Sequence, residues 1–255
     1  MKKNIIITAG PTNEPIDAVM KITNMSTGAL GNVVAETFLE DKADEIGKIY
    51  YISTKMSYKP RIGLKKVELV IVETTQDLID ALKDIFSRDR IDIIVHSCAV
   101  GDYAGEYVVR AEDLAHEIYE NIQNAVKKEE ITEESIMDVF RNPACVCNNS
   151  TKISSYEPNL MAKMKLTPKV ISLIKEMAPN VTLVGFKLLE SVSKEYLYQV
   201  ASKLREKNDA NYIVANDLAK IGDGKHWAMI LNGDGVITEC QTKKEIAKAL
   251  EGILF

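Results

Sequence analysis

The chain has 255 residues, of which 46% are hydrophobic and 27% charged, a composition typical of a globular protein with a sizeable core. Its net charge of −5 argues against broad nucleic-acid binding, which needs a dense basic face. The sequence shows neither a signal-peptide apolar segment nor a run approaching the roughly 18 apolar residues of a membrane span. We therefore expect a cytoplasmic protein that binds neither nucleic acid nor membrane.

The cysteines and histidines do not suggest a metal site. Cys145 and Cys147 are separated by one residue, whereas Cys98 and Cys240 stand alone in the sequence. The chain contains no Cys-x-x-Cys pair, and only three histidines are available to complete a zinc site. We expect reduced structural thiols and predict no metal-binding residues.

Strands and helices alternate in the first part of the chain. In order, the patterns predict a strand at Ile5–Ala9, a helix at Gly31–Leu39, strands at Ile49–Ile52 and Val67–Val72, a helix at Thr75–Phe86 and a strand at Ile91–Val95. Thr75 is the predicted N-cap of the second helix. This alternation predicts an α/β, Rossmann-like fold, with a mostly parallel sheet and helices on both faces.

Residues 105–145 interrupt the alternation. They are rich in Glu and Lys, and two helical patterns predict a helical insertion at Leu114–Val126 and Glu133–Phe140. The later elements are a strand at Leu160–Leu166, a helix starting near Thr167-Pro168, a strand at Val181–Phe186, a helix at Lys194–Glu206, a strand at Tyr212–Ala215, a hairpin of Trp227–Leu231 and Val236–Cys240, and a helix at Lys243–Leu250. We expect a single α/β domain over residues 1–255.

Polar segments follow four of the predicted strands. They are Gly10–Gly31, Ser97–Tyr103, Gly185–Lys187 and Ala215–Asp217. Because ligands bind beyond the carboxyl ends of the strands in an open parallel sheet, these segments form the candidate site. The small residues of Asn24–Gly31 lead into a helix, an arrangement suited to a phosphate. A plain strand-to-helix turn is the alternative, since the segment matches neither a Walker A loop nor a Gly-x-Gly-x-x-Gly fingerprint.

Other polar residues have competing interpretations. Tyr51 and Lys55 have the spacing of short-chain oxidoreductases, but they end a predicted strand, where the two side chains would not share a helical face. A dinucleotide site also favours an acidic residue there, whereas this chain has Ser53 and Thr54. We interpret His96 as a core or rim histidine rather than a catalytic base. Asp102 could accept a ribose hydroxyl, help to bind a metal, or cap a turn.

A set of motifs in collinear order resembles the phosphopantothenate–cysteine ligase family. The motifs extend from the first strand to residue 217 and comprise Gly10–Asp17, Ile22–Asn24, Ser26–Gly28, Ala99–Tyr103, Lys152–Ser155, Lys165–Pro168, Gly185–Leu188 and Val214–Asp217. Each motif is short, but the ordered set is specific. The chain starts directly at the first strand, so we expect a stand-alone bacterial form without the flavin-dependent decarboxylase often fused ahead of this domain.

The resemblance implies a two-step ligation in coenzyme A synthesis. The carboxylate of 4′-phosphopantothenate attacks the α-phosphorus of a nucleoside triphosphate, and the cysteine amine then displaces the nucleoside monophosphate. The bacterial family implies CTP, with ATP as the alternative, and Mg²⁺ as cofactor. Family members form homodimers through a small β element, for which Leu160–Leu166 and the closing hairpin are candidates.

The resemblance also assigns site residues by matched position. Asn24 would hold the acyl-nucleotidylate and, with Lys21, bind the substrate, and Lys152 and Lys187 are the other predicted catalytic residues. The predicted nucleotide-binding residues are Ser26, Gly28, Gly31, Ala99, Asp102, Thr167, Pro168, Lys169, Val170, Phe186, Lys203, Lys207 and Asn216. Taken separately, each lysine could be an ordinary solvated surface residue, whereas their convergence would neutralise a triphosphate and its departing pyrophosphate.

The chain departs from the family pattern at two positions. Met20 stands where many fused bacterial forms carry an arginine for the substrate, and Ser154 stands where they carry a third flap lysine. Lys152 and Lys187 are the candidates to supply this charge. An NAD(P)-dependent reductase of Rossmann type is the alternative function, and a non-catalytic nucleotide-binding regulator is a third.

Overall fold

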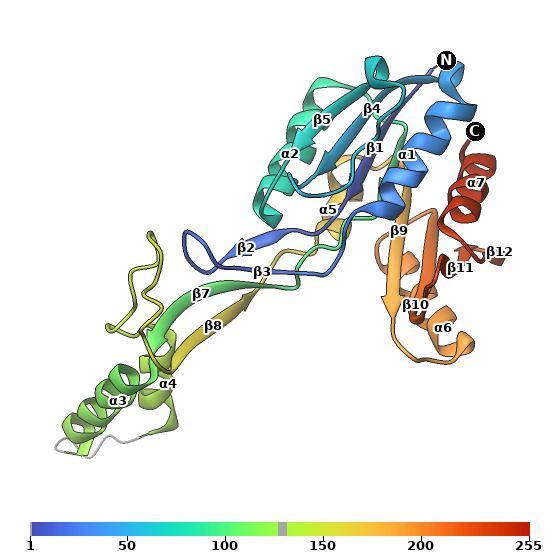
Figure 1. The fold of residues 1–255 in the computed structure, drawn as a ribbon. Helices are drawn as coiled ribbons and strands as arrows, with labels where there is room; N and C mark the ends of the chain where they lie inside the picture. Colours follow the sequence, from blue (N-terminus) through green and yellow to red (C-terminus); the bar gives the residue numbers. More distant parts are fainter. Residues whose placement is uncertain (1, 127–131) are drawn as a thin grey trace. The chain divides into compact units, whose positions relative to one another are not determined.

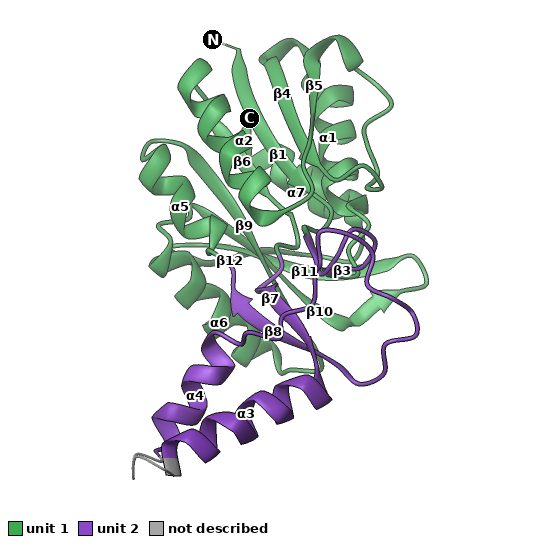
Figure 2. Cartoon of the chain, turned by 90° about the vertical axis from the view of Figure 1, so that its left-hand side faces the viewer, with its two compact units in different colours: residues 1–13, 24–100, 168–255 green, residues 14–23, 101–167 purple. Residues whose placement is uncertain are grey.

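The computed structural model describes residues 2–126 and 132–255, which divide into two compact units. Unit 1 comprises residues 1–13, 24–100 and 168–255, and unit 2 comprises residues 14–23 and 101–167 (Figure 2). Each unit is therefore built from separate pieces of the chain.

A mostly parallel sheet forms the centre of unit 1 (Figure 1). Its spatial order is β12 (Gly235–Cys240), β11 (Lys225–Asn232), β10 (Tyr212–Gly222), β9 (Thr182–Leu189), β6 (Ile93–His96), β1 (Lys3–Ala9), β4 (Ile46–Ser53) and β5 (Val67–Ile71). The strands from β10 to β5 pair in parallel, and β11 and β12 add an antiparallel hairpin. Ile5, Ile6 and Ile7 are fully buried because β1 is covered on both faces.

Helices cover both faces of this sheet. Residues of α1 (Ala29–Asp41) and α7 (Lys243–Leu254) pack with Ile5 and Ile7 on one face. Residues of α2 (Thr75–Arg88), α5 (Val170–Met177) and α6 (Lys194–Lys207) pack with Ile6 on the other. Two short 3₁₀ turns, η1 (Ala43–Glu45) and η2 (Leu64–Lys66), lie beside β4 and β5 in the sequence. The predicted α/β fold with helices on both faces is confirmed.

Several predicted element ends are wrong by a few residues. Thr74, not Thr75, caps α2: its Oγ1 accepts the N–H of Asp77, and the Asp77 carboxylate accepts the N–H of Thr74 in return. The helix expected near Thr167-Pro168 begins at Val170, after Lys169 in an extended conformation. Strand β10 continues to Gly222, beyond the predicted end at Ala215, through an irregularity after Asn216.

Unit 2 contains small antiparallel sheets and two helices. Strand β2 (Asn13–Pro15), which begins in unit 1, pairs with β3 (Lys21–Thr23), and β7 (Tyr103–Arg110) pairs with β8 (Leu160–Leu166). Helices α3 (Ala111–Val126) and α4 (Glu133–Arg141) correspond to the two predicted helices, but the helical insertion predicted from residue 105 is wrong at its start, because residues 105–110 belong to β7. Helix α4 packs through Val139 on a small cluster with Tyr107, Val109 and Leu114. Within residues 2–126 and 132–255, no helix is both long and apolar enough to cross a bilayer.

Candidate functional site

The chain segments that follow β1 and β6 remain paired beyond the strands. The N–H of Ser97 donates to Thr8 O at 3.1 Å, and the N–H of Ala99 donates to Gly10 O at 2.8 Å. The register also aligns His96 with both Thr8 and Gly185. The carboxyl ends of β1 and β6 and the middle of β9 therefore share one level of the sheet.

Asn24 is tied to the end of β6. Its amide nitrogen donates to Ala99 O and to Val100 O, each at 3.1 Å. Two residues predicted for the same site, Asn24 and Ala99, are thus brought together from positions far apart in the sequence. Although the Asn24 side chain is exposed, these two hydrogen bonds fix the orientation of its amide.

The loop between Asn24 and α1 is compact and rich in small residues. Gly28, the N-cap of α1, adopts φ 76°, and a Cβ there would lie 3.0 Å from Gly10 N. A Cβ on Gly31 would lie 2.6 Å from the Ala9 Cβ and 2.7 Å from the Ser97 Oγ. Ser26 Oγ accepts the Gly28 N–H at 3.4 Å. The glycines let α1 begin directly on the sheet edge, where its first-turn N–H groups and dipole favour an anion.

Strands β9 and β10 present Phe186, Lys187 and Asn216. Phe186 packs with the cluster on the α1 and α7 face, and the alternation of the strand directs Lys187 to the opposite face. Asn216 is only 8% exposed, and its Nδ2 lies 3.3 Å from His226 Nε2. Burial, aided by the charge of Lys243, lowers the pKa of His226 to about 4, so this histidine is neutral at pH 7. The Asn216 amide is therefore held inside the sheet by a neutral histidine.

The first turn of α5 lies against the end of α6. Ser172 Oγ donates to Asn208 Oδ1 at 2.7 Å. Lys207 directly precedes Asn208, and Lys203 lies one helical turn earlier, with both side chains exposed. The structure thus brings Lys207 to the same region of unit 1 as Val170 at the start of α5.

Within unit 2, Asp102 and Thr167 are neighbours. The N–H of Thr167 donates to Asp102 O at 3.0 Å, and the Thr167 hydroxyl donates to Gly101 O. The Asp102 side chain is exposed, whereas Thr167 is buried. Two predicted nucleotide-binding residues from distant motifs therefore meet where β7 begins and β8 ends.

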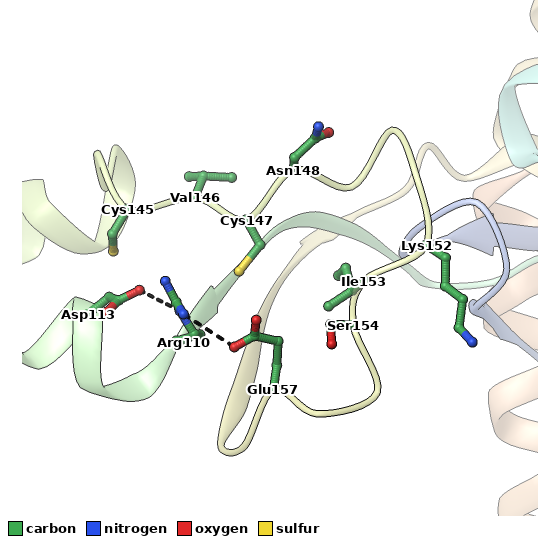
Figure 3. A pocket seen from close by; sticks show the side chains of 10 residues that line it. All are labelled: Arg110, Asp113, Cys145, Val146, Cys147, Asn148, Lys152, Ile153, Ser154 and Glu157. Atoms are coloured by element: carbon green, nitrogen blue, oxygen red, sulfur yellow. Dashed lines mark hydrogen bonds and ion pairs between the residues drawn. The ribbon is translucent and has the colours of Figure 1, made fainter.

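Lys152 lines a cavity of about 340 Å³ in unit 2. Arg110, on the wall, donates to Asp113 at 2.7 Å and to Glu157 at 3.3 Å (Figure 3). The Lys152 side chain points away from these ion pairs in the same view. The cavity was not predicted, because its walls come from segments separated by more than 30 residues in the sequence.

His96, predicted as a core or rim histidine, is a core residue. Its Nδ1 lies 2.9 Å from Thr8 Oγ1, and burial lowers its pKa to about 4. Burial also raises the pKa of the Cys98 thiol to about 12 and, with Glu117, that of Cys145 to about 11. Both thiols remain protonated at pH 7 and are therefore weak nucleophiles.

The described residues form no cluster of three or more histidine, cysteine, aspartate or glutamate side chains that could hold a metal ion. Magnesium that accompanies a nucleotide usually binds the phosphates, water and only one or two carboxylates. The described residues therefore suit a magnesium ion that binds together with a triphosphate better than one held by protein ligands alone.

Residues 1–112 match the family described as the DNA/pantothenate metabolism flavoprotein C-terminal domain. The chain is similar to the coenzyme A biosynthesis bifunctional protein CoaBC of Thermococcus kodakarensis, with 28% identity over 97% of this chain and 50% of the relative. The CoaBC protein of Methanocaldococcus jannaschii is 26% identical over 96% of this chain and 49% of its own length. The chain thus spans about half the length of these relatives.

Solved structures extend the similarity to the whole fold. The DNA/pantothenate metabolism flavoprotein of Streptococcus pneumoniae is 31% identical, with a TM-score of 0.77 over 98% of this chain and 97% of that one. The C-terminal domain of a CoaBC protein shares the fold at 22% identity, with a TM-score of 0.62 over 99% of this chain and 95% of that one. Similarity along nearly the full length of both chains confirms the predicted family: the protein belongs to the DNA/pantothenate metabolism flavoproteins and resembles their C-terminal domain.

Proposed function

We propose that the protein joins 4′-phosphopantothenate to L-cysteine through an acyl-nucleotidylate, using CTP and Mg²⁺, in coenzyme A biosynthesis. The observation that carries this proposal is the position of Asn24. Its amide is tied to Ala99 O and Val100 O, beside the small-residue loop that begins α1. Family membership and the coenzyme A names of the relatives support the same substrates.

In the first step, a carboxylate oxygen of 4′-phosphopantothenate bonds to the α-phosphorus of CTP, and pyrophosphate leaves. In the second, the cysteine nitrogen bonds to the acyl carbon, CMP leaves with the electron pair of the broken C–O bond, and the nitrogen loses a proton. These steps need alignment, charge neutralisation and exclusion of water rather than a protein nucleophile. Protonated thiols at Cys98 and Cys145 agree with that requirement.

The residues of unit 1 would divide these tasks. Gly28, Ser26 and the start of α1 would bind phosphate oxygens, and Lys187, Lys203 and Lys207 would neutralise the leaving pyrophosphate. Asn24 would hold the intermediate, with an anhydride oxygen replacing one of its two carbonyl acceptors. Mg²⁺ would polarise the triphosphate when bound with it.

The remaining predicted nucleotide contacts would bind the base and ribose. In unit 1 they are Ala99, Pro168, Lys169, Val170, Phe186 and Asn216, and in unit 2 Asp102 and Thr167. Because the Asn216 amide already pairs with His226, we assign it a supporting role rather than direct contact with the nucleotide. Lys21 and Lys152 of unit 2 would bind the acid substrate. Gly31 would act by packing, since a Cβ there would overlap Ala9.

The test is pyrophosphate release across CTP, ATP, GTP and UTP, each with 4′-phosphopantothenate and with or without cysteine. We expect release with CTP and formation of the cysteine adduct only when cysteine is present. No release with any nucleotide would remove the ligase proposal and favour a non-catalytic nucleotide-binding regulator. Tight NADPH binding without CTP binding would instead favour a reductase, which no feature of the described site supports.

We also propose a homodimer in the cytoplasm, where nucleoside triphosphates are available. Alternate residues of β8 share one face, and three of them, Leu160, Met164 and Leu166, are large apolar side chains exposed in the single chain. Strand β8 therefore has the character of an interface, and its apolar face suits a second copy of the chain.

A further inference from the structure

The turn between β2 and β3 contains a buried carboxylate that the proposed mechanism does not use. Asp17 is 6% exposed. Its Oδ1 accepts the N–H of Val19 at 2.7 Å and of Met20 at 2.6 Å. Its Oδ2 accepts the N–H of Ile153 at 2.8 Å, from a segment 136 residues away. One side chain thus fixes two separate backbone segments of unit 2.

The Asp17 carboxylate is held in its charged form. The N–H groups of Met20, Ile153 and Val19 lower its pKa below the usual value, and the charge of Lys152 lowers it further. Because both oxygens accept hydrogen bonds, the carboxylate plane is fixed and cannot rotate without breaking a contact on one side. The two segments are therefore held in a constant relation to each other.

A lysine adjoins each anchored segment. Lys21 directly follows Met20, and Lys152 directly precedes Ile153, and both side chains are exposed. A lysine ammonium on a flexible stem binds a phosphate less tightly than a fixed cation, because the side chain loses conformational freedom on binding. Anchoring the backbone next to each lysine reduces the volume that each ammonium group explores.

We propose that Asp17 is a positioning residue, which holds Lys152 and the Lys21 strand together so that their ammonium groups bind the phosphate monoester of the acid substrate. The inference rests on the proposed function and deepens it. A phosphate monoester carries up to two negative charges near pH 7, so two lysines match it in charge. Asp17 itself touches no substrate: the N–H groups occupy both of its oxygens.

Binding of 4′-phosphopantothenate, measured by calorimetry without nucleotide, tests this role. We expect Asp17→Asn to weaken this binding about tenfold or more, because an amide nitrogen facing the Ile153 N–H cannot accept its hydrogen bond. The KM for CTP and the kcat at saturating acid should change much less. Pantothenate, which lacks the phosphate, should bind wild type and variant equally.

The matched control is Glu117→Gln. Glu117 also accepts backbone N–H groups within unit 2, from Ala144 and Cys145, but neither anchored residue adjoins a lysine. This variant should bind 4′-phosphopantothenate like wild type. Lys21→Met combined with Lys152→Met should weaken binding, and adding Asp17→Asn to this double variant should weaken binding little further, because Asp17 acts through the two lysines.

Two results would overturn the inference. One is unchanged 4′-phosphopantothenate affinity in folded Asp17→Asn, and the other is an equal loss for CTP, phosphopantothenate and pantothenate, which indicates general damage. If Asp17→Asn unfolds, Asp17→Glu takes its place, since the longer side chain keeps the charge but moves the carboxylate away from the Ile153 N–H, and it should give the same selective loss. Wild-type protein that binds 4′-phosphopantothenate but releases no pyrophosphate would contradict the proposed ligase while leaving the role of Asp17 open to measurement.

Discussion

At the scale of single residues, Asn24 joins the first loop of the sheet edge to the end of β6 through two carbonyl oxygens. In Asn24→Asp, a carboxylate would face the same two carbonyls without a hydrogen to donate. We expect the variant to fold but to form the cysteine adduct about a hundredfold more slowly, the typical loss when one donor to a developing charge is removed. Adduct formation followed by mass spectrometry measures this.

The control for that variant is Asn124→Asp, on the exposed surface of α3. It makes the same chemical change in another part of the chain and should leave turnover unchanged. Wild-type turnover in Asn24→Asp would remove the role assigned to this side chain.

The buried His96 predicts how stability depends on pH. Its pKa is lowered from 6.5 to about 4 by burial, so between these values only the unfolded chain binds the proton. The contribution of His96 to the free energy of unfolding should therefore decrease as the pH falls through this window, by about 2 kcal/mol between about pH 7 and pH 5. His226, whose pKa is also lowered to about 4, adds to the decrease in the same window. Urea denaturation at the two pH values measures the decrease.

His96→Gln should remove the His96 part of that pH dependence, because a glutamine does not titrate, and leave the part that His226 contributes. His116→Gln is the matched control, since His116 is exposed on α3 and faces Glu120. An equal pH dependence in wild type and His96→Gln would show that other groups cause the decrease.

Sequence reasoning identified some residue contacts and missed others. The family motifs placed Asn24 and Ala99 in one site, and the position of His96 near a strand end indicated a core or rim histidine. The pairing of Asn216 with His226 and the bonds from Asp17 to Ile153 were not predicted. A hydrogen bond between distant segments leaves no periodicity in either one, so local patterns contain no trace of it.

At the scale of elements, the contact between α1 and β1 depends on a missing side chain. A Cβ on Gly31 would lie 2.6 Å from Ala9 Cβ, a distance that forces α1 to shift. We expect Gly31→Ala to reduce the free energy of unfolding by about 1–3 kcal/mol, the usual cost of overpacking. Chemical denaturation measures the change.

Gly252→Ala on α7 is the control for Gly31→Ala. The same substitution should raise the free energy of unfolding at this position. An added Cβ there would meet no described atom within 4 Å, so alanine gains helix propensity at no steric cost. We expect this variant to be more stable than wild type by roughly 0.5–1 kcal/mol. Equal effects at both glycines would contradict the packing explanation for Gly31.

Most element types were predictable from periodicity, whereas their ends were not, and the strands β2, β3 and β7 were missed. The strand over Leu160–Leu166 was predicted with its correct bounds, because its alternation is regular. The N-cap of α2 was placed one residue late, since Thr74 and Thr75 are both good caps and only the bond to Asp77 distinguishes them. The long β10 was cut short because the irregularity after Asn216 breaks the pattern.

At the scale of the whole molecule, the exposed face of β8 predicts a dimer. Leu160→Lys combined with Met164→Lys places two charges on the apolar face. We expect wild type to sediment as a dimer at micromolar concentration and the double variant as a monomer. Met161→Lys, on the opposite face of β8, should remain dimeric, and a monomeric wild type would contradict the proposal.

The division into two units was beyond the reach of the sequence. Residues 14–23 and 101–167 form one unit although 77 residues lie between the two pieces. The Glu- and Lys-rich stretch 105–145 indicated part of the second piece, but no pattern in the sequence linked residues 14–23 to it. The α/β fold and the family were predictable because alternation and ordered motifs are both linear features. The assembly of unit 2 from two pieces is a property of contacts in space.

Strand β6 pairs with β1 on one side and with β9 on the other. During synthesis on the ribosome, β1 and β6 emerge long before β9, because residues 97–181 must be translated in between. Until then the growing sheet has an open edge at its centre, with backbone groups available to any other extended chain. A polypeptide released after Thr167 would contain every residue of unit 2 and still lack the strand that closes this edge, so truncated products should be prone to aggregation and proteolysis.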